Sequence, residues 1–110
     1  MKKLKGFQKK YLRGLAHRLK PVVLVGQKGL TAELITSTDQ ALDRHELIKV
    51  KFNEFKKKDE KAEISGRIER NTGSIVVGAI GHVVIFYRQQ DDPEKQKIVL
   101  PRPEARKGSA

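Results

Sequence analysis

The sequence contains no cysteine and no tryptophan, and only 5% of its residues are aromatic. Without cysteine, disulfide bonds and thiolate metal sites are excluded, and a cytosolic location is favoured. No apolar stretch approaches the ~20 residues that a membrane-spanning helix needs. The basic start Met1–Lys5 is not a signal peptide, because Lys9, Lys10 and Arg13 interrupt the apolar run that would have to follow. We therefore expect a soluble, cytoplasmic protein with no membrane partner.

Acidic residues are missing from the first third of the chain. Residues 1–32 hold nine lysines and arginines, and the first acidic residue is Glu33. The net charge is +11, and most of the excess falls in this stretch. A solubilising surface would normally mix both signs. A basic excess confined to one region is instead typical of a protein that binds a polyanion.

Residue groupings typical of catalysis are also missing. The histidines His17, His45 and His82 fall in separate predicted elements without metal-ligand spacing, and no serine stands in a nucleophile-elbow motif. Asp39 and Asp43, one helical turn apart, are explained more simply as a solvated helix face than as an acid–base pair. We predict a protein that is not an enzyme and has no cofactor, no metal site and no small-molecule substrate.

Hydrophobic periodicity predicts that residues 4–19 form an amphipathic helix. Its apolar stripe consists of Leu4, Phe7, Tyr11, Leu15 and Leu19, widened by Leu12 and Ala16, and its basic arc consists of Lys9, Lys10, Arg13 and Arg18. A membrane-surface helix is an alternative, but without tryptophan and with strands following, packing on a sheet is favoured. Gly14 predicts a close contact with another backbone, and Pro21 ends the helix.

The next segments predict a βαβ unit. Val22–Val25 is apolar on both sides and predicts an interior strand. Thr31 is suited to cap a second helix that ends near Arg44-His45. Alternating apolar and basic residues over 46–52 predict a half-buried strand.

A third helix and a hairpin complete the predicted domain. Asp59 is suited to cap this helix and Gly73 to close it. Strands 74–80 and 83–88 are joined by a tight turn at Gly81-His82.

Three details of the C-terminal half can be predicted as well. Gly78 predicts a bulge or a close approach. Phe86 and Tyr87 point to opposite faces, so one of them is expected in the core. Residues 98–100 predict an edge strand or a packed tail.

The predicted fold is a compact α/β single domain. Its elements follow the order α-β-α-β-α-β-β, with a four-stranded mixed sheet. The domain spans residues 1–102, and residues 103–110 form a disordered polar tail.

The loop Gly26-Gln27-Lys28-Gly29 is the strongest candidate for a binding site. Exposed N–H groups and the dipole of the following helix favour a phosphate there. Only two residues separate the glycines, which excludes a nucleotide P-loop, and no third glycine completes a dinucleotide motif. KH-type modules clamp a nucleic-acid backbone with a Gly-x-x-Gly loop. A plain β–α connection is the alternative.

Motifs along the chain resemble those of the CRM-domain, YhbY-like RNA-binding family. In order, they are Gly14-Leu15-Ala16-His17, Leu19-Lys20-Pro21-Val22-Val23, Gly26-x-x-Gly29-Leu30-Thr31, residues 45–51, residues 81–88 and Leu100-Pro101-Arg102. The resemblance covers about residues 5–102 and implies a fold similar to the C-terminal domain of translation initiation factor three, with the glycine loop at the RNA surface. Bacterial members of this family are associated with precursors of the large ribosomal subunit, and plant relatives build intron-splicing factors. The chain departs from the pattern at Ser65-Gly66 and in its tail.

We therefore predict binding of structured RNA, ribosomal RNA on large-subunit precursor particles above all. The predicted nucleic-acid-binding residues are Gly26, Gln27, Lys28, Gly29, Thr31, Lys9, Lys10, Arg13, His17, Arg18 and Lys20. Because aromatic residues are sparse, phosphate contacts are expected to dominate over base stacking. The alternative is a ribosome-docking protein whose main contact is protein.

Overall fold

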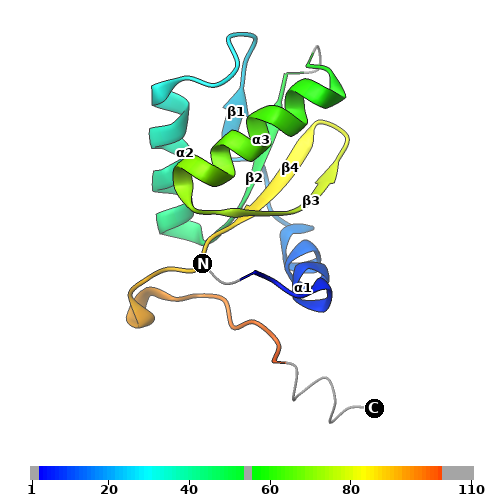
Figure 1. Ribbon diagram of the computed structural model, residues 1–110. Coiled ribbons are helices and arrows are strands. Elements are labelled where there is room, and N and C mark those ends of the chain that lie inside the picture. The colour runs from blue at the N-terminus through cyan, green and yellow to red at the C-terminus, as the bar shows by residue number, and fades with distance from the viewer. Residues whose placement is uncertain (1–2, 54–55, 103–110) are drawn as a thin grey trace.

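A computed structural model describes residues 3–53 and 56–102, in which helices and strands alternate (Figure 1). The elements are α1 (Gly6–Ala16), β1 (Val23–Val25), α2 (Ala32–His45), β2 (Leu47–Phe52), α3 (Lys58–Thr72), β3 (Ile75–Ile80), β4 (Val83–Tyr87) and a short 3-10 helix η1 (Pro93–Lys95). This order confirms the predicted α/β fold. The predicted disordered tail at 103–110 lies outside the described residues.

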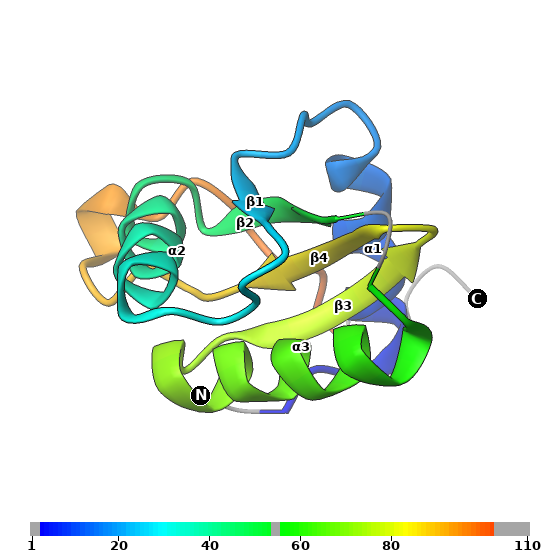
Figure 2. The ribbon, with the colours of Figure 1, turned by 90° about the horizontal axis from the view of Figure 1, so that it is seen from above.

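The four strands form one mixed sheet in the order β1-β2-β4-β3. β1 pairs with β2 in parallel, and β4 pairs with β2 and β3 in antiparallel fashion. Helices α2 and α3 lie on one face of the sheet, and α1 lies on the other (Figure 2). Strand β4, the last to be synthesised, is therefore in the interior of the sheet.

Each face of the sheet carries its own apolar cluster. On one face, Leu42 of α2 and Ile64 and Ile68 of α3 pack against β1, β2 and β4. On the other face, Leu12 and Ala16 of α1 pack against residues of β2, β3 and β4. This second cluster positions α1.

The buried face of α1 differs from the predicted apolar stripe in the middle of the helix. Leu12 and Ala16 are fully buried, whereas Tyr11 and Leu15 are 42% and 40% exposed. The helix also ends at Ala16, ahead of Pro21. The close backbone contact predicted at Gly14 is absent, because a Cβ there would meet nothing within 4 Å among the described residues.

Strand β1 is an edge strand, which corrects the prediction that it is interior. It has only three residues and pairs with β2 on one side. Val23 and Val25 belong to the apolar cluster on the face covered by α2 and α3, while Leu24 points away from it and is 70% exposed. An apolar run on both faces did not imply burial on both faces.

Phe86 and Tyr87 point to opposite faces of β4 as predicted, but both of them, rather than one, lie in the core. Both are fully buried, because α1 covers the second face of β4 at this level. The Tyr87 hydroxyl has no hydrogen-bond partner among the described residues. Burial, with the nearby Glu46 carboxylate, raises the pKa of Tyr87 to about 12.

The helix and turn signals of the C-terminal half are mostly confirmed. Gly73 ends α3 with a φ of +70°, and Gly81 takes a φ of +58° in the hairpin turn. Asp59 does not cap α3, because the helix begins two residues earlier than predicted and Lys57 holds the cap position. The N–H of Lys57 donates to the Glu60 carboxylate at 3.2 Å. Both expectations for Gly78 hold: a register shift lies beside it, and the Arg13 side chain covers it.

The segment after β4 is held by the buried carboxylate of Glu46. This residue lies between α2 and β2 with a positive φ of 64°. Its two oxygens accept hydrogen bonds from the backbone N–H groups of Gln90, Lys97 and Ile98 at 2.7–3.0 Å. Residues 98–100 are therefore a packed tail, with Ile98 and Leu100 against the second cluster.

We expect Glu46→Ala to lower the free energy of unfolding by roughly 2–4 kcal/mol, because three backbone N–H groups lose their acceptor. Chemical denaturation measures this change. Glu63→Ala, an exposed site on α3, is the matched control and should shift stability by no more than about 0.5 kcal/mol. Equal effects of the two substitutions would show that the carboxylate does not hold the segment.

Candidate nucleic-acid interface

The glycine loop is a tight turn between β1 and α2. The N–H of Gly29 donates to the carbonyl oxygen of Gly26 at 3.1 Å, which closes the turn. Gly29 has a φ of +73°, a left-handed conformation that glycine tolerates best. Gly26 does not have a positive φ. Gln27 and Lys28 are exposed at the tip. The lysine is thus presented to solvent on a short, defined backbone.

Lys56 braces this loop from the segment before α3. Its ammonium group donates to the carbonyl oxygen of Gln27 at 3.0 Å and lies 3.8 Å from the Glu60 carboxylate. It would also lie 3.6 Å from a Cβ placed on Gly29. The sequence prediction missed Lys56, although the run Lys56-Lys57-Lys58 could have drawn attention to it.

Thr31 caps α2 as predicted. Its hydroxyl oxygen accepts a hydrogen bond from the Leu34 N–H at 3.1 Å. Glu33 lies in the same first turn, and its negative charge reduces the attraction of the helix dipole for an anion. Phosphate attraction at this loop therefore depends mainly on Lys28.

The basic side of α1 faces the β3–β4 hairpin. Lys10, Arg13 and His17 follow each other at spacings of three and four residues and so share one side of the helix, and Lys9 lies one turn before Arg13. Arg13 marks where this side points: its guanidinium donates to the Val77 carbonyl oxygen at 2.9 Å, and its stem covers Gly78. Arg13 is thus hydrogen-bonded to β3, and its positive charge still contributes to the attraction of an anion.

The remaining predicted cations follow α1 or lie in the loop. Arg18 and Lys20 lie in the exposed segment between α1 and β1. Six of the predicted binding residues have side chains without a hydrogen-bond or ion-pair partner among the described residues: the cations Lys9, Lys10, Arg18, Lys20 and Lys28, and the imidazole of His17.

The two halves of the predicted interface lie in different layers. The loop leads into α2 on one face of the sheet, while α1 lies on the opposite face (Figure 2). The edge strand β1 and the segment that precedes it join them. The predicted residues therefore do not form one flat patch but curve around the edge of the sheet.

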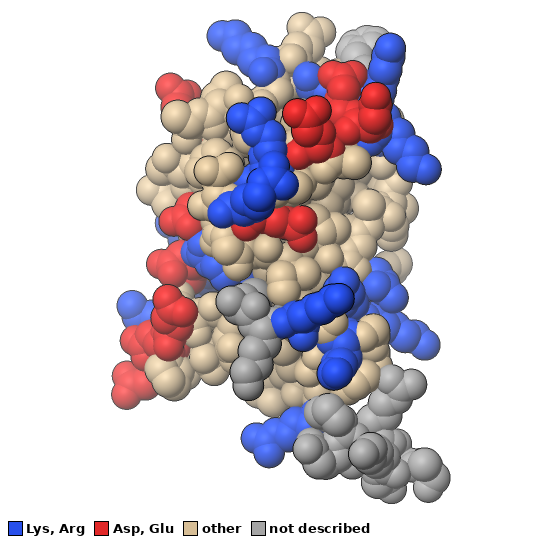
Figure 3. All heavy atoms as spheres, in the orientation of Figure 1, with Lys and Arg blue, Asp and Glu red and all other residues tan. Residues whose placement is uncertain are grey.

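The acidic residues of the described chain are concentrated away from α1. Helix α1 and strands β1 to β4 contain no aspartate or glutamate. On the side shown in Figure 3, the region over α1 at the lower right carries Lys and Arg and no acidic side chain, whereas red side chains lie over α2 and α3. In this view the surface over α1 is therefore basic.

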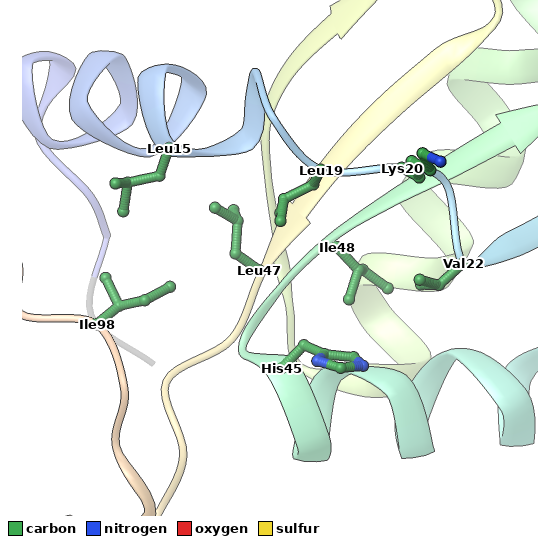
Figure 4. Close-up of a pocket in the computed structure, with 8 residues that line it drawn as sticks. All are labelled: Leu15, Leu19, Lys20, Val22, His45, Leu47, Ile48 and Ile98. Atoms are coloured by element: carbon green, nitrogen blue, oxygen red, sulfur yellow. The ribbon is translucent and has the colours of Figure 1, made fainter.

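A pocket of about 390 Å³ lies on the side of α1 opposite the basic one. Leu15, Leu19, Leu47 and Ile98 point toward one another around it, and Lys20 and His45 are at its margin (Figure 4). This pocket explains why Leu15 and Leu19 are only partly buried: α1 ends here and the C-terminal segment does not close over them.

Neither a metal site nor a membrane span appears in residues 3–53 and 56–102. No group of three or more histidine or acidic side chains there could hold a metal ion. No helix in the same ranges is long and apolar enough to cross a membrane.

Comparison with known proteins relates the chain to RNA-binding domains. Residues 4–88 match the model of the CRS1 / YhbY (CRM) domain family. A Haemophilus influenzae protein named RNA-binding protein is 43% identical over 95 residues, which cover 86% of this chain and 92% of that protein. A candidate RNA-binding protein of Bacillus subtilis is 33% identical over 98 residues, which cover 89% of this chain and 99% of its own length.

A solved structure supports the same relation. The solution structure of a hypothetical protein from Staphylococcus aureus, described as a candidate RNA-binding protein, superimposes with a TM-score of 0.74 at 33% identity. The match covers 90% of this chain and all of that one.

We expect the two loop glycines to differ in their effect on stability. Gly29→Ala places a methyl group on a left-handed backbone and should cost about 1 kcal/mol. Gly26→Ala meets open space at an ordinary φ, so it should leave the free energy of unfolding nearly unchanged. Thermal or chemical denaturation of both variants checks this, and a larger loss for Gly26→Ala would contradict the loop geometry.

Proposed function

The chain belongs to the CRS1 / YhbY (CRM) domain family, and from this membership and the surface described above we propose that it is an RNA-binding protein without enzymatic activity. The proposed interface consists of the Gly26–Gly29 loop with Thr31, the basic side of α1, and the segment that carries Arg18 and Lys20.

The observation that supports this proposal best is the separation of charge. Acidic residues are absent from α1 and all four strands, while six of the predicted cationic and imidazole side chains have no partner among the described residues. Unpaired cations on elements without acidic residues attract a polyanion, and each phosphate they neutralise releases counterions. With about five phosphate contacts, the logarithm of the binding constant should fall with log salt at a slope of roughly −3 to −4 on single strands.

We further propose that the RNA is ribosomal RNA on precursors of the large subunit, in the cytoplasm. This part rests on the resemblance of the chain to bacterial members of the family. The loop provides backbone access and Lys28 a point charge, a combination that suits the sugar–phosphate backbone of a structured RNA.

The pocket beside α1 favours a second candidate function. Its apolar lining, with Leu15 and Leu19 partly exposed, could receive an apolar side chain of a protein. In that case the chain would dock on the ribosome mainly through protein, and its basic surface would supply only non-specific attraction. Such a complex should survive nuclease treatment, whereas an RNA-dependent one should not.

We expect Lys28→Glu to weaken binding to structured RNA about tenfold at 0.1 M salt, because one phosphate contact is replaced by repulsion. The salt slope should also become less steep by about 0.7. Lys95→Glu is the matched control, since Lys95 is an exposed lysine in η1 and makes the same charge change far from the loop. Equal losses in fluorescence-anisotropy titrations would show that the loop is not the binding site.

Crosslinking in cells, followed by sequencing of the attached RNA, tests the choice of RNA. We expect enrichment of large-subunit ribosomal RNA. We also expect the protein to sediment with precursor particles and to be released from them by nuclease treatment. Scattered messenger RNA fragments without ribosomal enrichment would overturn the ribosomal assignment but leave RNA binding in place.

A further inference from the structure

One row of side chains crosses the sheet on the same face as α1 but is not covered by it. The strand registers place Leu24 opposite Lys51, Lys51 opposite Val83, and Val83 opposite Ile80. Val83 faces the same way as Ile85, two residues on, which packs under α1. We call Leu24, Lys51, Val83 and Ile80 the exposed row.

The helix stops short of this row. Arg13 lies over Gly78, which pairs with Ile85 one row away. Beyond it, Leu24 is 70% exposed, Ile80 is 73% exposed and Lys51 is also exposed, while Val83 between them is half-buried. Branched aliphatic side chains on a sheet normally pack against another layer, and an exposed apolar patch of this kind marks an interaction site.

The surroundings of the row determine which partner fits. Arg13, on the basic side of α1, borders it on one side, and β1 leads from Leu24 to Lys28 at its other end. The row and these borders belong to elements without an acidic residue. A fitting partner is therefore negatively charged and also offers apolar surface.

We propose that the exposed row is a platform for unpaired bases of a bound RNA strand. The bases pack on Leu24, Val83 and Ile80, while Lys51 and the bordering cations contact the phosphates. A continuous duplex keeps its bases stacked inside and would leave the apolar side chains in water. This inference rests on the proposed RNA-binding function and adds that the target contains a single-stranded segment.

The exposed row also connects the two separate halves of the proposed interface. The glycine loop and α1 lie on different faces of the sheet, and the row lies between them at the edge strand. An RNA strand that runs from the basic side of α1 across β1 to Lys28 passes over Leu24. The two groups of cations can then hold one RNA strand, with the apolar row beneath its bases.

The test compares a single-stranded RNA of sixteen nucleotides with a duplex of sixteen base pairs, at one salt concentration, by fluorescence anisotropy. In the double variant Leu24→Ser/Ile80→Ser, single-strand affinity should fall about five- to tenfold while duplex affinity and the salt slope stay unchanged. Both sites are highly exposed, so the fold should tolerate the change, and thermal unfolding verifies this. Val99→Ser, at an 83% exposed apolar site in the C-terminal segment, is the matched control.

The outcomes separate the inference from the proposed function. An unchanged single-strand affinity in the double variant, or an equal loss for the single strand and the duplex, overturns the platform. If Lys28→Glu still weakens binding in that case, the proposed function stands without the platform. Failure of the unmodified protein to bind either probe overturns the proposed function itself, and the platform with it.

Discussion

The buried carboxylate of Glu46 joins two parts of the chain that are far apart in sequence. It lies at the junction of α2 and β2 and accepts hydrogen bonds from three backbone N–H groups beyond β4. These bonds bring Ile98 and Leu100 onto the second apolar cluster, the one on which α1 packs. Three bonds from neutral amides satisfy a buried carboxylate without a cation, so no lysine is withdrawn from the surface to neutralise it.

The placement of α1 in turn decides where the positive charge lies. Leu12 and Ala16 bury one side of the helix, and Arg13 anchors a second side to the carbonyl oxygen of Val77. Gly78 makes this possible, because a Cβ at that position would lie only 2.6 Å from the Arg13 side chain. The missing side chain of one residue thus lets the guanidinium stem lie flat on the sheet and orients the basic side of α1 along the hairpin.

Local signals in the sequence were sufficient for the order of elements and for several of their ends, although not for the end of α1 or the start of α3. Thr31, Gly73 and Gly81 act as a cap, a helix terminus and a turn because backbone geometry alone demands such residues there. What the sequence could not reveal depends on partners that are distant along the chain. Whether Val22–Val25 is interior or at an edge depends on where β4 inserts, and the stripe of α1 was ambiguous because seven apolar residues offered two overlapping faces.

In the candidate site, too, local signals predicted some features, while others depend on residues that are distant along the chain. The glycine spacing and the acid-free first third identified the loop and the basic helix. Nothing local indicated that they lie on opposite faces of the sheet, or that Lys56 would brace the loop while Arg13 is bound to β3. Glu46 gave no signal either, because one acid ahead of a strand is ordinary until its partners are placed.

The interior position of β4 has a consequence for how the molecule is made. A ribosome that has released only the first 80 residues has released β1, β2 and β3, but β2 and β3 cannot take their places in the sheet until β4 is inserted between them. Pairings of such high sequence separation form late and raise the entropic cost of folding. The N-terminal fragment therefore emerges as a strongly cationic chain without its sheet, and the loop, the helix and the surface between them are assembled in one cooperative event near the end of synthesis.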